Sequence, residues 1–246
     1  MAEKSERKKL LVCPYAKALG RTPKKKAERV SEILKNVYED SLCALEFNEG
    51  DSKNTPYRLL VMSRLSAQCT DKRVNIVSKE LFKEYPDVFS MAEAPLEDIE
   101  RIVRPCGLYK TKAKSIKDAC VIICREYGGV VPCTYDDLIN LPGIGMKIAN
   151  LIMGELYDDP RIVPDTHCMR ISHRLGLTSV PDDPVKCERE LSAIVEKKEQ
   201  SDFCHRLVFF GREFCSAQGP RCGDCPISSF ASGDKGVNGD ETAKNK

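Results

Sequence analysis

Residues 134–159 read TYDDLINLPGIGMKIANLIMGELYDD and carry the clearest structural signal in the chain. Thr134 and Asp137 have the spacing of a capping box, which predicts a helix that begins there and runs to Leu141. Pro142 cannot continue the helix, and the glycines of the PGIG sequence permit a tight turn. A second, apolar helix follows the turn. The stretch is therefore predicted to fold as two short helices joined by a hairpin.

The turn between the two helices is a candidate DNA-binding element. Backbone N–H groups and the positive end of the second helix dipole are exposed at such a turn, so they can hold a phosphate without a basic side chain. We therefore expect Leu141, Gly143 and Gly145 to contact DNA. The formal net charge of +2 predicts no basic field over the whole chain. An ordinary tight turn between packed helices is the alternative interpretation.

Lys147 is the candidate nucleophile of this stretch. A helical projection places it opposite the apolar side chains, on an outer face shared with Asn150 and Gly154. In the first turn of a helix the dipole disfavours the charged ammonium form, and a neutral amine is nucleophilic. The alternative is a surface lysine that contacts a phosphate.

Asp165 is the candidate partner of Lys147. It precedes a helical pattern, THCMRISHRL, which ends at Gly176, so it is predicted to be the N-cap of that helix. The second hairpin helix is roughly 16 Å long, and the eight residue steps that follow it span up to ~26 Å when extended. The chain can therefore return and bring the carboxylate beside the amine. A capping role alone is the alternative for this aspartate.

The remaining sequence predicts an all-α protein made of many short helices. Apolar residues recur at three- and four-residue intervals, without sustained strand alternation. Hydrophobic residues make up 41% and charged residues 31%, as in soluble globular proteins. Thirteen cysteines, an odd number, indicate reduced thiols rather than a disulfide framework. With no apolar run long enough for a signal peptide or a membrane span, we expect an intracellular, cytoplasmic protein with no membrane partner.

Several further motifs resemble one enzyme family. Residues 59–71 (LLVMSRLSAQCTD), 107–116 (GLYKTKAKSI) and 202–215 (DFCHRLVFFGREFC) stand in the same order as similar segments of the endonuclease III branch of the helix-hairpin-helix DNA glycosylases. Together with the hairpin and the VPDTH sequence around Asp165, they cover roughly residues 30–230. The sequence thus resembles this family over most of its length.

By this resemblance Lys147 matches the catalytic lysine and Asp165 the catalytic aspartate, and the lysine marks the bifunctional members. The implied partner is double-stranded DNA that contains oxidised pyrimidines or abasic sites, bound by a monomeric, nucleoid-associated enzyme. The damaged base is extruded from the duplex, the Lys147 amine displaces it, and the Schiff base then undergoes β-elimination. Gln68 matches the residue that fills the gap, and Asp71 and His167 match positions near the cleft. For His167, a structural hydrogen bond is an equally good interpretation.

The resemblance also implies two helical lobes with the DNA cleft between them. Residues 25–47 and 164–231 would form a terminal helical domain with a cysteine loop, and residues 48–163 a six-helix barrel that contains the hairpin. Residues 25–47 are predicted to be mainly one long helix. Residues 1–24 are expected to form a basic flexible arm, and residues 232–246 a disordered polar tail.

The cysteine loop departs from the family pattern. The family has four cysteines spaced six, two and five residues apart, which hold a [4Fe–4S] cluster. This chain keeps Cys215, Cys222 and Cys225 but has Ala231 in the fourth place. Three outcomes stay open: a cluster with an open or non-cysteine fourth site, a different metal, or a metal-free loop. No other cofactor is expected.

Two other functions stay open at the level of the sequence. A monofunctional glycosylase would release the base without cutting the strand. A non-catalytic helix-hairpin-helix protein would use Lys147 only to contact phosphate and Asp165 only to cap a helix. Trapping of a covalent adduct with abasic DNA separates the enzyme from the binding module.

Overall fold

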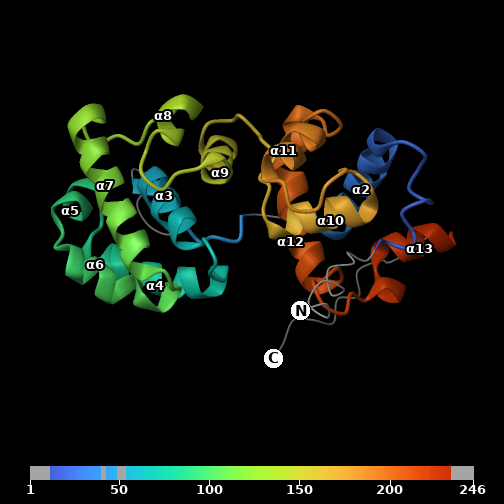
Figure 1. The fold of residues 1–246 in the computed structure, drawn as a ribbon, viewed down its shortest axis with the longest axis horizontal. Coiled ribbons are helices and arrows are strands. Elements are labelled where there is room, and N and C mark those ends of the chain that lie inside the picture. Colours follow the sequence, from blue (N-terminus) through green and yellow to red (C-terminus); the bar gives the residue numbers. More distant parts are fainter. Residues whose placement is uncertain (1–11, 40–42, 49–53, 234–246) are drawn as a thin grey trace, which may run out of the picture. The chain divides into compact units, whose positions relative to one another are not determined.

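Helices make up the regular structure of the chain wherever it is described. The computed structural model describes residues 12–39, 43–48 and 54–233, and in these ranges every element is an α-helix or a short 3₁₀ helix (Figure 1). The predicted all-α class is therefore confirmed. The predicted tail from residue 234 onward, and residues 1–11 of the predicted arm, lie outside the described residues.

Backbone contacts divide the chain into two compact units, one of which is discontinuous in sequence. The central unit is Cys43–Pro160, and the terminal unit combines Met1–Leu42 with Arg161–Lys246. These boundaries fall a few residues before the predicted ones, 47/48 and 163/164. Leu45 and Phe47 belong to the core of the central unit. The Val163 N–H, in contrast, donates to Cys204 Sγ within the terminal unit.

The central unit builds one apolar core from short helices. Its elements are α3 (Thr55–Leu65), α4 (Asp71–Glu84), α5 (Val88–Glu93), α6 (Leu96–Val103), η2 (Arg104–Cys106), α7 (Tyr109–Tyr127), α8 (Tyr135–Ile139) and α9 (Met146–Leu156). The long helix α7, drawn in green in Figure 1, packs against α5 and α6, and α3 packs against α9. Side chains such as Leu60, Leu81 and Ile116 are fully buried between them. This core supports the hairpin formed by α8 and α9.

The terminal unit combines one helix from the start of the chain with those that follow residue 161. Its elements are α2 (Pro23–Val37), α10 (Thr166–Leu175), α11 (Pro184–Ser192), η3 (Lys197–Glu199), α12 (Gln200–Glu213), η4 (Cys222–Asp224) and α13 (Pro226–Ser232). α12 packs against α10 and α2, and α13 packs against α2. The prediction of a helix continuing to Phe47 is wrong, because Tyr38 leaves the helical conformation and caps α2.

The segment before α2 is docked on the terminal unit over its described part. Ala16 and Leu19 are 6% and 3% exposed. The backbone N–H of Cys13 donates to the Arg174 carbonyl in α10 at 2.9 Å. The expectation of a flexible arm therefore does not hold for residues 12–22, because this stretch buries apolar side chains and forms a backbone bond to α10.

None of the helices within the described ranges is both long enough and apolar enough to cross a lipid bilayer.

Candidate active site

The hairpin forms where the sequence predicts it. Thr134 Oγ1 accepts the backbone N–H of Asp137 at 3.2 Å, and its hydroxyl donates to the Asp137 carboxylate at 2.5 Å. This cap begins α8 as predicted. The helix ends at Ile139, with Asn140 as its C-cap, rather than at Leu141. Leu141 precedes proline, and such a residue is disfavoured in the helical conformation.

Gly143 is required by the turn for two independent reasons. Its φ of +77° lies in the left-handed region, which favours glycine. A Cβ atom built at this position would lie 2.5 Å from Arg64 Nε and 2.8 Å from Ser115 Cβ. Arg64 Nε donates to Ser115 Oγ at 2.8 Å, so the turn rests on a fixed polar contact between α3 and α7.

The side chain of Leu141 is buried. Its side chain is 3% exposed and packs in the core of the central unit, as does that of Ile144. The two apolar residues anchor the turn from inside, while the two glycines at positions 143 and 145 are exposed. The exposed surface of the turn is therefore the backbone of its glycines, and a DNA contact by Leu141 stays a prediction for its backbone.

Lys147 lies exposed in the first turn of α9. Gly145 is the N-cap of this helix, and no side chain caps its first N–H groups. The predicted outer face is only partly correct, because Asn150 is 1% exposed and Gly154 is half-buried. Lys147 is thus an exposed amine beside uncapped N–H groups.

Asp165 caps α10 as predicted. Its carboxylate accepts the backbone N–H of Cys168 at 2.6 Å, and the helix ends at Gly176 in the left-handed conformation. The predicted core side of α10 is buried, including Ile171 and Leu175. The carboxylate itself is half-buried. Of the two candidate catalytic residues, Lys147 thus belongs to the central unit and Asp165 to the terminal unit.

His167 lies one helical turn from Arg170 and contacts its guanidinium. Nδ1 of His167 is 3.2 Å from Arg170 Nη2, and because arginine can only donate, Nδ1 is the acceptor. Arg170 Nη2 also donates to the Cys215 carbonyl at 3.0 Å. A Cβ atom at Gly211 would lie 2.4 Å from His167 Nδ1. These contacts support the structural interpretation of His167, as a packed residue between α10 and α12.

Gln68 lies on a strained turn between α3 and α4. It is exposed and has a φ of +53°, in the left-handed region that non-glycine residues seldom adopt. Asp71 is half-buried in the first turn of α4, where a negative charge favours the helix dipole. The turn therefore presents Gln68 outward and uses Asp71 at a helix start.

A second strained turn, between η2 and α7, carries a residue that the sequence did not single out. Leu108 has a φ of +48° and is 58% exposed, although leucine is usually buried. One buried ammonium group binds the start of both turns. Lys112 Nζ donates to the carbonyl of Leu65, at the end of α3, and to that of Cys106, at the end of η2, at 2.8 Å each. Burial lowers the pKa of Lys112. The GLYKTKA sequence was the available signal, because it contains both Leu108 and Lys112.

Comparison with known proteins places this geometry in a family. The family described as "HhH-GPD superfamily base excision DNA repair protein" matches residues 61–197. Endonuclease III of Bacillus subtilis (strain 168) is 42% identical over 177 residues, which cover 72% of this chain and 81% of the relative.

Two solved structures are similar over nearly the whole chain. A non-covalent endonuclease III–DNA complex has a TM-score of 0.78 at 37% identity and covers 86% of this chain and 95% of that one. A trapped endonuclease III–DNA covalent intermediate has a TM-score of 0.77 at 38% identity, with 85% and 94% covered. The chain belongs to the endonuclease III family. It is therefore a base excision repair enzyme of the glycosylase and abasic-site lyase class.

The cysteine loop of this endonuclease III homologue follows α12. Cys225 is buried, and Cys215 and Cys222 are half-buried. Arg174 from α10 holds the start of the loop, since it donates to the carbonyls of Ser216 and Ala217 at 2.7 and 3.1 Å. The loop is therefore an ordered element that presents three thiols.

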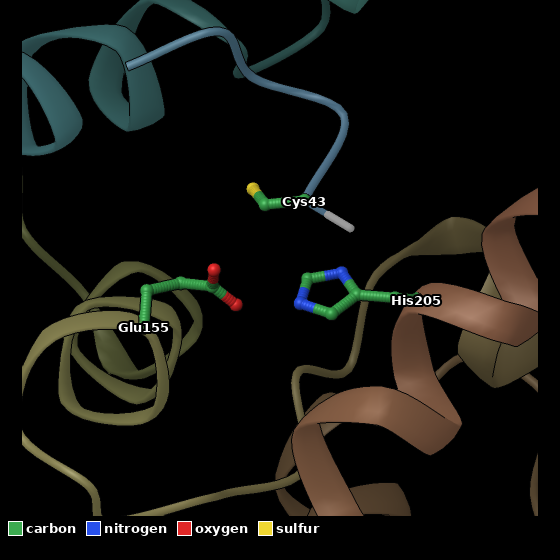
Figure 2. Close-up of side chains that lie close together, drawn as sticks. All are labelled: Cys43, Glu155 and His205. Carbon is green, nitrogen blue, oxygen red and sulfur yellow. The ribbon is translucent and has the colours of Figure 1, made fainter. Parts of the chain in front are cut away.

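Figure 2 labels Cys43, Glu155 and His205, three side chains of types that can bind a metal. Cys43 precedes α3 and Glu155 lies on α9, both in the central unit, whereas His205 comes from α12 of the terminal unit. Within the central unit, burial raises the pKa of the Cys43 thiol to about 12, and the charge of Glu155 adds to this effect. Cys43 is thus a protonated thiol at neutral pH.

Proposed function

We propose that this endonuclease III homologue, acting as a monomer, excises oxidised pyrimidines from double-stranded DNA and then cleaves the strand by β-elimination. The observation that carries the proposal is the exposed amine of Lys147 in the first turn of α9, directly after a glycine turn with uncapped N–H groups. A phosphate bound by those N–H groups would place the DNA backbone beside the amine.

Lys147 is proposed to act as the nucleophile. Its amine attacks C1′ of the damaged nucleotide, the N–C1′ bond forms, and the glycosidic bond breaks as the base leaves with a proton that the amine gives up. Opening of the sugar ring gives a Schiff base. Loss of a proton from C2′ and cleavage of the C3′–O bond then release the 3′ phosphate. Hydrolysis of the imine regenerates the amine, so no other nucleophile is needed.

Asp165 is proposed to stabilise the positive charge that develops on the sugar. The cap bond to the Cys168 N–H fixes the carboxylate at the start of α10. A fixed, ionised carboxylate lowers the energy of a cationic transition state more than a mobile one does, because it needs no reorganisation. It can also assist proton transfer at the reacting sugar.

The two strained turns are proposed to stabilise the extruded base. Gln68 has a polar side chain that can occupy the gap in the duplex. Leu108 is an exposed apolar side chain of the kind that inserts between base steps. Lys112 donates to the Leu65 and Cys106 carbonyls, one beside each turn. These two hydrogen bonds fix the turn of Gln68 relative to the turn of Leu108.

Borohydride trapping tests the proposal. Incubated with a duplex that contains one abasic site, the wild-type protein should form a covalent adduct that is stable after reduction of the Schiff base. Lys147→Gln should form none, while its affinity for the same duplex stays within about fivefold, because the backbone phosphate site is intact. Lys83→Gln, which removes an exposed lysine at the end of α4, is the matched control and should trap as wild type.

Base release and strand cleavage should be scored separately on duplexes that carry thymine glycol. Release followed by cleavage supports the bifunctional reaction. Base release from an uncut strand would indicate a monofunctional glycosylase, and binding with neither product would indicate a DNA-binding module. Trapping by Lys147→Gln as efficient as by wild type would place the nucleophile elsewhere.

A further inference from the structure

The cysteine loop has a fourth cysteine beside it that the spacing does not reveal. One cavity in the terminal unit is lined by Cys13, Cys215, Cys222 and Cys225. The cavity is partly open to solvent. Ala231, which occupies the family's fourth ligand position, lies in α13 and is not part of the described cavity wall.

Cys13 is held at this cavity by its backbone. Its N–H donates to the Arg174 carbonyl at 2.9 Å, and its own carbonyl accepts the N–H of Ala16 at 3.1 Å. Ala16 and Leu19 then bury their side chains in the terminal unit. The thiol is therefore positioned at the cavity by two hydrogen bonds and by apolar packing, which is how a fixed ligand is built.

The same arginine supplies positive charge to the cavity. Arg174 is 4% exposed, and its Nη1 lies 3.3 Å from Cys215 Sγ. Its Nε is buried and has no hydrogen-bond partner in the structure. A buried cation with an unpaired N–H is costly unless an anionic group lies beside it. Arg174 lines the cavity, so a negatively charged occupant would satisfy it.

The separation of the sulfur atoms favours a cluster over a single ion. A zinc ion bound by four cysteines has Zn–S bonds of about 2.3 Å, which brings the sulfur atoms to within about 4 Å of one another. Among the described residues, no three of these four sulfur atoms lie within 4.8 Å of one another. In a [4Fe–4S] cluster each thiolate binds a different iron, so the sulfur atoms are farther apart. Four thiols around one cavity are the donor set that such a cluster takes.

We propose that Cys13 is the fourth ligand of a [4Fe–4S] cluster whose other ligands are Cys215, Cys222 and Cys225. The family resemblance implies the cluster, whereas the choice of Cys13 rests on this structure. On binding, each thiol releases its proton to solvent and each thiolate bonds to one iron, without oxidation of any protein sulfur. Cys204 is not the ligand, because it does not line this cavity. Its Sγ instead accepts the Val163 N–H, at a distance of 3.2 Å.

The cluster would hold the loop rather than take part in the chemistry of Lys147. It is not required for the imine reaction, which uses only the amine and the sugar. The proposal about Cys13 is therefore independent of the proposed function, and the two fail separately. Loss of borohydride trapping in Lys147→Gln tests the reaction, whereas metal content tests the ligand.

Iron and sulfide analysis of anaerobically purified protein is the primary test. We expect about four iron and four sulfide per wild-type chain, with the visible absorption of a cluster. Cys13→Ser should lose at least one iron per chain, with either a colourless product or the paramagnetic signal of a three-iron cluster. Cys133→Ser, which removes an exposed cysteine of the central unit, is the matched control and should keep all four. Full iron content in Cys13→Ser, or iron-free wild-type protein, overturns the proposal.

Alkylation of the wild-type protein gives a second test that does not depend on the folding of a variant. In the iron-loaded protein, Cys13 should be protected from iodoacetamide together with the three loop cysteines, as read by peptide mass spectrometry. Removal of iron with a chelator should expose all four to alkylation. Cys133 should react in both states. Alkylation of Cys13 in the loaded protein, while the other three stay protected, overturns the assignment.

Discussion

The Asp165 carboxylate caps α10 and is proposed to stabilise positive charge on the sugar. Two substitutions separate these roles. Asp165→Asn keeps an oxygen that can accept the Cys168 N–H, so we expect the unfolding free energy to change by less than about 0.5 kcal/mol. The charge is lost, however, so glycosylase turnover should fall by about 100-fold or more. Urea unfolding and single-turnover base release measure the two effects.

Asp183 provides the matched control for this experiment. It caps α11 in the same way, since its carboxylate accepts the Lys186 N–H at 2.9 Å. Asp165→Ala and Asp183→Ala should each lower the unfolding free energy by about 1 kcal/mol, but only the change at Asp165 should abolish base release. Normal turnover by Asp165→Asn would show that the Asp165 carboxylate only caps α10 and takes no part in the reaction.

Individual side chains also show where inference from the sequence stops. A helical projection gives the angle of a residue but not its neighbours, so it placed Asn150 outside when the structure buries it. The spacing likewise did not show that the Leu141 side chain packs in the core of the central unit. Lys147 was placed correctly, because a lysine opposite an apolar face rarely turns inward.

The hairpin turn predicts different results for its two glycines. Gly143→Ala must place a methyl group at a positive φ and within 2.5 Å of Arg64 Nε, so we expect a loss of about 1–3 kcal/mol in unfolding free energy. Gly145→Ala has a φ of −101° and open space around the new methyl group, so its stability should change by less than about 1 kcal/mol.

The two variants should rank in the opposite order for DNA affinity, with the larger loss in Gly145→Ala. The methyl group of Gly145→Ala would stand at the uncapped start of α9, where a phosphate is proposed to bind, so affinity for an abasic duplex should fall by about tenfold. Thermal unfolding and fluorescence anisotropy are the measurements. Equal stability of Gly143→Ala and wild type would contradict the packing argument, and unchanged binding by Gly145→Ala would contradict the phosphate site.

Helix ends were predictable wherever a local signal fixes them. Thr134, Asp165 and Gly176 act as the sequence indicated, because each works through hydrogen bonds or backbone angles within a few residues. α5 carries a capping box formed by Asp87 and Ser90, but its six residues are too few for a visible periodicity. The end of α2 at Val37 was missed because no glycine or proline marks it.

For the molecule as a whole, buried thiols predict a loss of stability in alkali. Burial raises the pKa of Cys106 and of Cys120 from an ordinary 9.0 to about 12. Between pH 9 and 12 these thiols stay protonated in the folded chain but ionise in the unfolded chain. The folded state then binds more protons, so stability falls as pH rises. In Cys120→Ala, the decline measured by urea unfolding under a non-thiol reductant should be shallower by up to about 1.4 kcal/mol per pH unit. An identical slope would exclude Cys120 as a contributor.

Long-range relationships were only partly accessible from the sequence. The discontinuous terminal unit followed from the family resemblance, which supplies the topology that spacing cannot. The proximity of Cys13 to the cysteine loop had no local signal, because about 200 residues separate them and loop closure over that length depends on tertiary packing. The strain at Gln68 and Leu108 was equally invisible, since a positive φ in a non-glycine residue is imposed by its surroundings.

The position of Cys13 gives the proposed cluster a topological role. Bonds from Cys13 and from Cys215 to one cluster would close a ring of about 200 residues that contains the entire central unit. In the chain-entropy treatment of cross-links, a ring of this size restricts the unfolded chain by on the order of 5 kcal/mol. The ring can close only after the central unit has been synthesised, because its two ends flank that unit in the chain. A single proteolytic cut within the central unit would then leave both segments of the terminal unit joined through iron.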